Sequence, residues 1–226
     1  MAGPTHIVSC EVLRNEMEAV LDRVAPGTPI EYFKGALHDY PDKMRVAVQE
    51  AIDATPGDCD ILLACGRCSN GTAGLSGGSH RLILPAVDDC IALLLGSRQA
   101  YLSEHSGEPG TYYYTRGWID YIDDPYKEYL KIIPKYGEEK AAMVARMILE
   151  NYTRVAIIDT PGVSGLDEAR PYLQTVSEFY DLPLVDLPGS LRFLEKLVGG
   201  PYDEEFLVVE PGDTLEERRF WALSGA

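Results

Sequence analysis

Three cysteines stand where apolar runs typical of β-strands give way to a turn or a helix: Cys10, Cys68 and Cys90. In a parallel α/β sheet such positions share one edge, so thiols far apart in the sequence can converge on one ligand. Three thiolates suit zinc with an open fourth position, or an iron–sulfur cluster with one open iron. Each cysteine taken singly is more often a small buried residue. Their shared placement predicts a metal site.

Polar residues near these cysteines are candidates for catalysis. His38 follows a predicted strand and has Asp39 beside it, so it is expected to orient the site or move a proton. Asp89, next to Cys90, has the same candidate role, and Asp88 is predicted to cap the following helix. A turn residue for His38 and helix-capping charges for the two aspartates are the structural alternatives.

Cys65 and Cys68 form a CxxC motif, for which thiol–disulfide exchange is one interpretation. A redox pair of this type begins a helix, whereas the residues after Cys68 are typical of a loop. A zinc ribbon needs a second such motif, and the chain has none. A lone CxxC is therefore a weak signal, and the redox function stays an alternative.

Two segments are candidates for holding a cofactor. The first is the glycine-rich loop 65–79, in which we assign Asn70 and Gly71 to cofactor binding because such loops let backbone approach a ligand closely. It lacks the spacing of a phosphate-binding loop. The second is the aromatic segment 110–120, from which we expect Tyr113, Arg116 and Trp118 to contact a planar or anionic ligand. Core packing is the alternative for these aromatic residues.

Strand-like and helix-like segments alternate along the chain. Strands are predicted at 7–10, 29–37, 60–64, 81–85, 154–159, 184–187 and 206–210, and segment 110–120 alternates like another. Helices are predicted at 11–24, 42–54, 89–102, 125–136, 138–152, 168–180 and 191–198. This order predicts an α/β fold of mainly parallel strands with flanking helices. We expect either two Rossmann-like lobes, 1–105 and 106–226, or one composite sheet.

Composition limits the function. The 226 residues are 46% hydrophobic and carry a formal charge of −16, enough to bury a full core but unsuited to a phosphate-binding face. We therefore expect no nucleic-acid partner. Neither a membrane helix nor a secretory signal is predicted, so we expect a cytoplasmic protein with reduced cysteines.

The chain also resembles a known family. The segments that carry the resemblance are Ser9–Leu13, Gly35–Lys43, Cys68–Gly71, Leu84–Cys90 with Leu94–Arg98, and Gly110–Trp118. They are similar to an uncharacterised prokaryotic family, the domain of unknown function numbered sixteen thirty-eight. The family pattern has cysteines where Cys10, Cys68 and Cys90 stand and a histidine at His38, whereas Cys65 is not part of it, so the resemblance implies a ligand set without Cys65. Where this chain has Asp88, the pattern is closer to histidine.

The resemblance implies a metabolic context but no particular reaction. Members resemble proteins often encoded beside corrinoid-dependent methyltransferases, which implies one-carbon metabolism and a corrinoid protein or methyltransferase as partner. The leading hypothesis is therefore a zinc or iron–sulfur protein, enzyme or accessory, that acts on a small-molecule substrate by methyl or thiol transfer. The alternatives are a non-catalytic carrier or sensor of a small molecule, and the thiol–disulfide protein.

Overall fold

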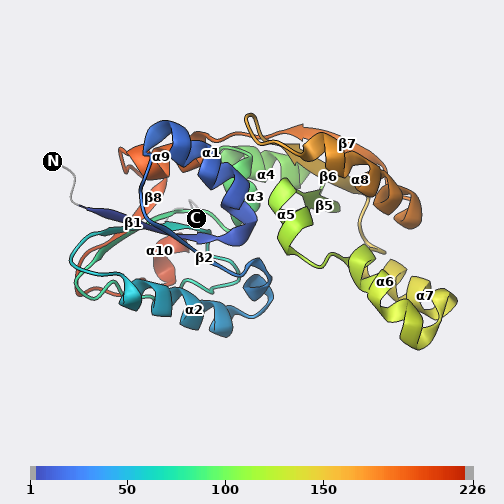
Figure 1. Cartoon of the computed structure of the whole chain (residues 1–226), viewed down its shortest axis with the longest axis horizontal. Helices are drawn as coiled ribbons and strands as arrows, with labels where there is room; N and C mark the ends of the chain where they lie inside the picture. Colours follow the sequence, from blue (N-terminus) through green and yellow to red (C-terminus); the bar gives the residue numbers. More distant parts are fainter. Residues whose placement is uncertain (1–3, 222–226) are drawn as a thin grey trace.

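The computed structural model describes residues 4–221, which form two β-sheets flanked by helices (Figure 1). The larger sheet has the strand order β2-β1-β3-β4-β8, in which only β8 is antiparallel. The smaller sheet is parallel, with the order β5-β6-β7. The predicted α/β class is therefore confirmed. The strands are β1 (Thr5–Cys10), β2 (Ile30–Phe33), β3 (Asp60–Ala64), β4 (Arg81–Pro85), β5 (Thr111–Tyr114), β6 (Arg154–Asp159), β7 (Leu184–Pro188) and β8 (Phe206–Val209).

Helices cover both faces of the larger sheet, as its continuous apolar strands require. The α-helices are α1 (Arg14–Val24), α2 (Pro41–Ala54), α3 (Cys90–Leu94), α4 (Arg98–Gly107), α5 (Arg116–Tyr121), α6 (Pro125–Tyr136), α7 (Glu138–Ile148), α8 (Leu166–Tyr180), α9 (Arg192–Gly199) and α10 (Arg218–Trp221). One core joins α1, α3 and α9 to one face, and a second core joins α2 to the other. In the described residues, no helix is both long and apolar enough to cross a membrane.

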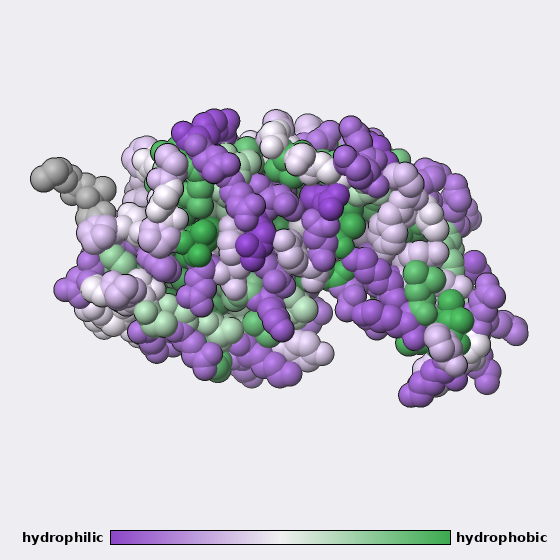
Figure 2. Space-filling view, viewed as in Figure 1, coloured by the Kyte–Doolittle hydropathy of each residue, from purple (hydrophilic) through white to green (hydrophobic). Residues whose placement is uncertain are grey.

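Helices α6 and α7 form a hairpin that projects away from the larger sheet (Figure 1). Tyr126 and Tyr129 of α6 pack on Phe179 of α8, which anchors the hairpin. Figure 2 shows hydrophobic side chains at the surface of this projection. The hairpin therefore belongs to the smaller sheet's side of the molecule and does not cover the larger sheet.

Several predicted elements are shorter than expected: segment 110–120 is a strand only over β5 and then forms α5, and the helix predicted at 138–152 ends at Ile148. The strand predicted at 29–37 ends at Phe33, and the chain continues as a 3-10 helix, Gly35–Asp39, that contains His38. A Cβ atom at Gly35 would lie 2.5 Å from Cγ2 of Val12. The chain turns here because Gly35 packs directly against the residues that follow β1.

The helix predicted at 89–102 is interrupted, and its cap is not Asp88. Asp89 Oδ1 accepts hydrogen bonds from the backbone N–H groups of Ile91 and Ala92, so Asp89 caps α3. Gly96 then adopts a φ of 81°, which ends the helical path, and the Ser97 hydroxyl caps α4. The break also separates a buried helix from a surface one, because α3 buries Ala92, Leu93 and Leu94 whereas α4 has no buried residue.

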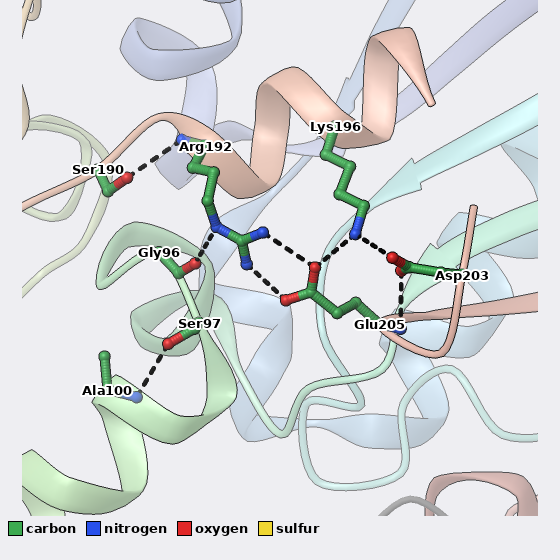
Figure 3. A network of polar contacts seen from close by, with 8 residues as sticks. All are labelled: Gly96, Ser97, Ala100, Ser190, Arg192, Lys196, Asp203 and Glu205. Atoms are coloured by element: carbon green, nitrogen blue, oxygen red, sulfur yellow. Dashed lines mark hydrogen bonds and ion pairs between the residues drawn. The ribbon is translucent and has the colours of Figure 1, made fainter. Parts of the chain in front are cut away.

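The C-terminal part of the chain returns to the larger sheet, where β8 pairs with β4. Figure 3 shows the polar network that fixes this return. Arg192 of α9 donates to both carboxylate oxygens of Glu205, at 2.9 and 2.5 Å, and to the Gly96 carbonyl at 2.8 Å. Lys196 joins Asp203 to Glu205. The larger sheet thus includes a strand from beyond residue 105, and the division into lobes 1–105 and 106–226 stays a prediction.

The contact of α5 with the turn after β1 is one of those that join the two sheets, which also share a hydrophobic core. A Cβ atom at Gly117 would lie 1.8 Å from the carbonyl oxygen of Val12, so the helix backbone rests directly on this turn. Glu16 of α1 is buried beside the same contact, where burial, reinforced by Asp120 of α5, raises its pKa to about 7. This junction therefore tolerates neither an added methyl group nor an added charge well.

Gly117→Ala should destabilise the fold because the added Cβ would clash with the Val12 carbonyl oxygen. This is a main-chain atom, which cannot move aside without shifting β1. We expect a loss of about 2–4 kcal/mol in the free energy of unfolding, measured by urea denaturation. Gly107→Ala is the control, since Gly107 also lies in a helix and a Cβ there meets nothing within 4 Å. Equal stability of the two variants would contradict the close approach.

Glu16 should make stability depend on pH. Its folded pKa of about 7 lies above the ordinary 4.5, so stability is fully present below about pH 4.5 and is lost as the pH rises through 7. The loss reaches up to about 3 kcal/mol. Glu16→Gln should therefore be more stable than the wild type at about pH 8 and similar at about pH 4. Urea denaturation at both pH values measures this, and Glu18→Gln on the exposed side of α1 should show no such difference.

Candidate functional site

A cavity of 410 Å³ lies where the carboxyl ends of β1, β3 and β4 meet β5 of the smaller sheet. The three predicted ligands Cys10, Cys68 and Cys90 all line it. The other lining residues include Val12, His38, Cys65, Arg67, Ser69, Asp88, Asp89, Ile91, Thr111, Tyr112, Tyr113, Trp118 and Tyr152. The structure therefore brings the predicted thiols, histidine and aspartates into one place.

The position of the cavity follows from the strand order. The chain leaves β1 to form β2 on one side and then crosses to form β3 on the other, so the topology switches between β1 and β3. In open α/β sheets, ligands bind outside the carboxyl ends of the strands at such a switch point. Cys10 ends β1 and Cys65 directly follows β3. The two thiols thus flank the position that this topology favours for a ligand.

The loop after β3 is held against the segment that leads into α3. Backbone N–H groups of Arg67 and Cys68 donate to the carbonyls of Val87 and Asp88, at 2.9 and 2.8 Å. A Cβ atom at Gly66 would lie 2.7 Å from the Asp89 backbone nitrogen, so only glycine permits this approach. The pairing places Cys68 beside the start of α3, where Cys90 lies.

Cys68 begins a strained turn. Cys68, Ser69 and Asn70 have φ values of 44°, 54° and 69°, in the left-handed region that non-glycine residues seldom occupy. Each such residue costs about 1–3 kcal/mol, and strain of this kind is concentrated at functional sites. This backbone strain therefore lies directly beside the cavity, which Cys68 and Ser69 line.

The cavity thiols are held in their neutral form. Burial raises the pKa of Cys10 and of Cys68 to about 12. Glu11 raises the pKa of Cys10 further, and Cys10 and Asp89 raise that of Cys68 further. Burial also raises the pKa values of Cys65 and Cys90, each reinforced by other cavity thiols. Thiolate nucleophiles have lowered pKa values. These cysteines therefore need a bound cation or a strong proton acceptor to ionise.

The fifth cysteine lies elsewhere. Cys59 directly precedes β3, at the opposite edge of the sheet, and its sulfur lies 3.4 Å from Nδ1 of His80. All five cysteines are free. Cys59 therefore serves as an internal reference for the four cavity thiols.

His38 faces the cavity with a defined ring orientation. Its Nδ1 lies 2.6 Å from the Gly35 carbonyl oxygen, which can only accept, so Nδ1 carries a proton. Nε2 lies 3.3 Å from Asp39 Oδ1, and the ring packs on Trp118 with the centroids 5.3 Å apart. Histidines that bind metals commonly donate the other ring nitrogen to a carbonyl in this way.

The two aspartates differ in their partners. Asp89 caps α3, shares a hydrogen bond with Tyr101, and has a pKa raised by burial. Asp88 is more exposed, with its carboxylate 3.2 Å from Nη2 of Arg67 and 3.9 Å from Nη2 of Arg98. Asp89 therefore has a structural role as well as access to the cavity.

Three of the residues assigned to cofactor binding are not brought to the cavity. The Asn70 amide donates to Glu217 at 2.7 Å, and Gly71 packs on Met44. Arg116 donates to Asp120 and to the Gly165 carbonyl. Tyr113 and Trp118, from the same set, do line the cavity. Arg67, Tyr112 and Tyr152 also line it and were not predicted; Tyr112 lies in the tyrosine run already noted, whereas Tyr152 carries no sequence signal.

The thiols line the cavity without gathering around one point. Across residues 4–221, no three His, Cys, Asp or Glu side chains are arranged to hold a metal ion. The donor types suit a soft metal, but coordination would require cysteine side chains to rotate toward a common centre.

Comparison with known proteins identifies the family. Residues 32–198 match the model described as "Protein of unknown function (DUF1638)". The chain belongs to this family. The DUF1638 match includes His38, Cys65, Cys68 and Cys90, and Cys10 precedes it. No curated protein and no solved structure matches the chain.

The raised pKa values predict slow alkylation of the cavity thiols. With a pKa of about 12, Cys10 and Cys68 hold roughly 1000-fold less thiolate at about pH 8 than an ordinary cysteine. Timed iodoacetamide labelling with a chelator present, read by peptide mass spectrometry, measures each site. Both thiols should label far more slowly in the native than in the urea-unfolded protein. Equal rates in the two states would contradict the assigned burial.

Proposed function

We propose that the cysteine cavity is the functional site and that Cys10, Cys68 and Cys90 bind a soft metal centre, zinc or an iron–sulfur cluster. The observation that carries the proposal is that these three thiols, from distant parts of the chain, line one cavity at the sheet's switch point. Alanine or valine would pack as well at these positions, so packing alone does not explain several neighbouring buried thiols.

The chemistry of the donors supports a cation as the ligand. A coordinated thiol is deprotonated outright, because the metal charge reverses the effect of burial on its pKa. The raised pKa values of the cavity thiols therefore describe the protein without its metal. Binding would release the thiol protons as the side chains converge.

The remaining cavity residues suggest a small substrate beside the metal. A volume of 410 Å³ is within the range for small-molecule sites, and Tyr113 and Trp118 supply an apolar wall. His38 would move a proton at Nε2, while Asp89 holds the start of α3 in place. A zinc ion would lower the pKa of a bound thiol and so supply a nucleophile for methyl or thiol transfer. The corresponding partner, a corrinoid protein or methyltransferase in one-carbon metabolism, rests on the family resemblance.

Zinc titration tests the ligand set. Calorimetry of the metal-free protein in buffers of different ionisation enthalpy should give one zinc per chain and about three protons released. Cys10→Ser, Cys68→Ser and Cys90→Ser should each weaken binding by about ten-fold or more and lower the proton count by about one. Metal analysis and the visible spectrum of anaerobically purified protein distinguish zinc from a coloured cluster.

The matched controls are Cys59→Ser, which removes a thiol outside the cavity, and Cys65→Ser, which removes one inside it but outside the proposed set. Neither should change the stoichiometry or the proton count. Stoichiometric metal that survives the loss of Cys10, Cys68 and Cys90 together would refute the proposal.

A metal-free binding protein is the second candidate. It is favoured by the cavity volume and by the absence, within the described residues, of a ready-made ligand set. A small molecule should then raise the melting temperature of the protein with a chelator present.

Thiol–disulfide exchange by Cys65 and Cys68 has less support, because burial raises both pKa values and leaves Cys65 only 1% exposed. Loss of activity in Cys65→Ser would favour it.

A further inference from the structure

The projecting hairpin carries a helix with apolar residues on two opposite sides. Ala141, Ala145 and Leu149 of the α7 segment are buried against the rest of the hairpin and its anchor. Met143 and Met147 lie on the opposite side of the helix and are 60% and 61% exposed, and Val144 and Ile148, on its flank, are 46% and 53% exposed. Among the residues that the structure describes, α7 is covered on one side only (Figures 1 and 2).

The charge of the hairpin distinguishes it from the rest of the chain. Residues 125–150 contain five basic and four acidic side chains, a net charge of +1, whereas the whole chain carries −16. Two copies of so acidic a protein repel each other over most of their surface. The hairpin is a segment where two copies can meet without that repulsion.

The order of residues along α7 is self-complementary. When two α7 helices lie antiparallel about a two-fold axis level with residue 145, Met143 of one copy lies against Met147 of the other. The same arrangement sets Lys140 against Glu150, and the axis repeats each contact. Met143 and Met147 line a surface groove together with Ala142 and the charged residues Glu138, Glu139, Lys140, Arg146 and Glu150. Within residues 4–221, neither Lys140 nor Glu150 has a salt-bridge partner.

We propose that two copies of this chain associate through their α6–α7 hairpins, with the α7 helices antiparallel and Lys140 of each copy paired with Glu150 of the other. The four helices then form a bundle that covers Met143, Val144, Met147 and Ile148. A contact that maps onto itself by a two-fold axis closes at the dimer. This interface is separate from the cysteine cavity, and its test is independent of the metal.

Sedimentation equilibrium of the full chain over a wide concentration range measures the association. The wild type should be a dimer, and Val144→Glu should raise the dimer dissociation constant by about ten-fold or more, because it buries a charge in the apolar seam. Val46→Glu is the matched control: Val46 is an equally exposed valine, 57% accessible, on α2. It should leave the dissociation constant unchanged. Circular dichroism confirms that both variants fold.

Charge reversal tests the antiparallel arrangement. Lys140→Glu and Glu150→Lys should each raise the dissociation constant by a few-fold, and the double variant should restore it, because both pairs re-form across the axis with their signs exchanged. A monomer at every concentration would overturn the proposal. So would a dimer that Val144→Glu leaves intact, or single reversals that the double variant does not rescue, since these results assign the contact to another surface.

Discussion

The contact between α5 and the turn after β1 is the constraint on which the site depends. The Gly117 backbone rests on the Val12 carbonyl, two residues after Cys10. This contact joins the carboxyl edge of the larger sheet to the aromatic segment that begins the smaller one. The cavity thiols lie at this edge. Tyr112, Tyr113 and Trp118 close the space above them and make a cavity.

Closure of the cavity also sets the chemistry of the thiols. Enclosed by protein on most sides, they lose the hydration that stabilises a thiolate, and each raises the pKa of its neighbours. Such a cluster is inert by itself and becomes charged only with a cation or proton acceptor. The same physics makes Glu16, buried beside the α5 contact, hold its proton. Burial near the junction thus favours the neutral form of both the Glu16 carboxyl and the cavity thiols.

Two glycines show how close backbone approach defines the site. Gly117 admits α5 to the turn after β1, and Gly66 admits the Cys68 loop to the Asp89 backbone. Both contacts are between segments far apart in the sequence. A side chain at either position would separate cavity walls that come from different strands. The left-handed turn that begins at Cys68 follows the Gly66 contact by two residues.

The sequence by itself determined the α/β class, most strands, and the convergence of Cys10, Cys68 and Cys90, because alternation of strands and helices places strand ends on one edge. It did not determine the break between α3 and α4, where Gly96 packs on Ser190 from a distant loop. Nor could local pattern tell that Asn70, Gly71 and Arg116 bind other parts of the chain while Arg67, Tyr112 and Tyr152 line the cavity. The spacing of apolar residues predicts which side of a helix or strand faces its own sheet. Which side chains enclose the thiols was decided only by the packing of the second sheet against the first, which depends on contacts between residues that no sequence period connects.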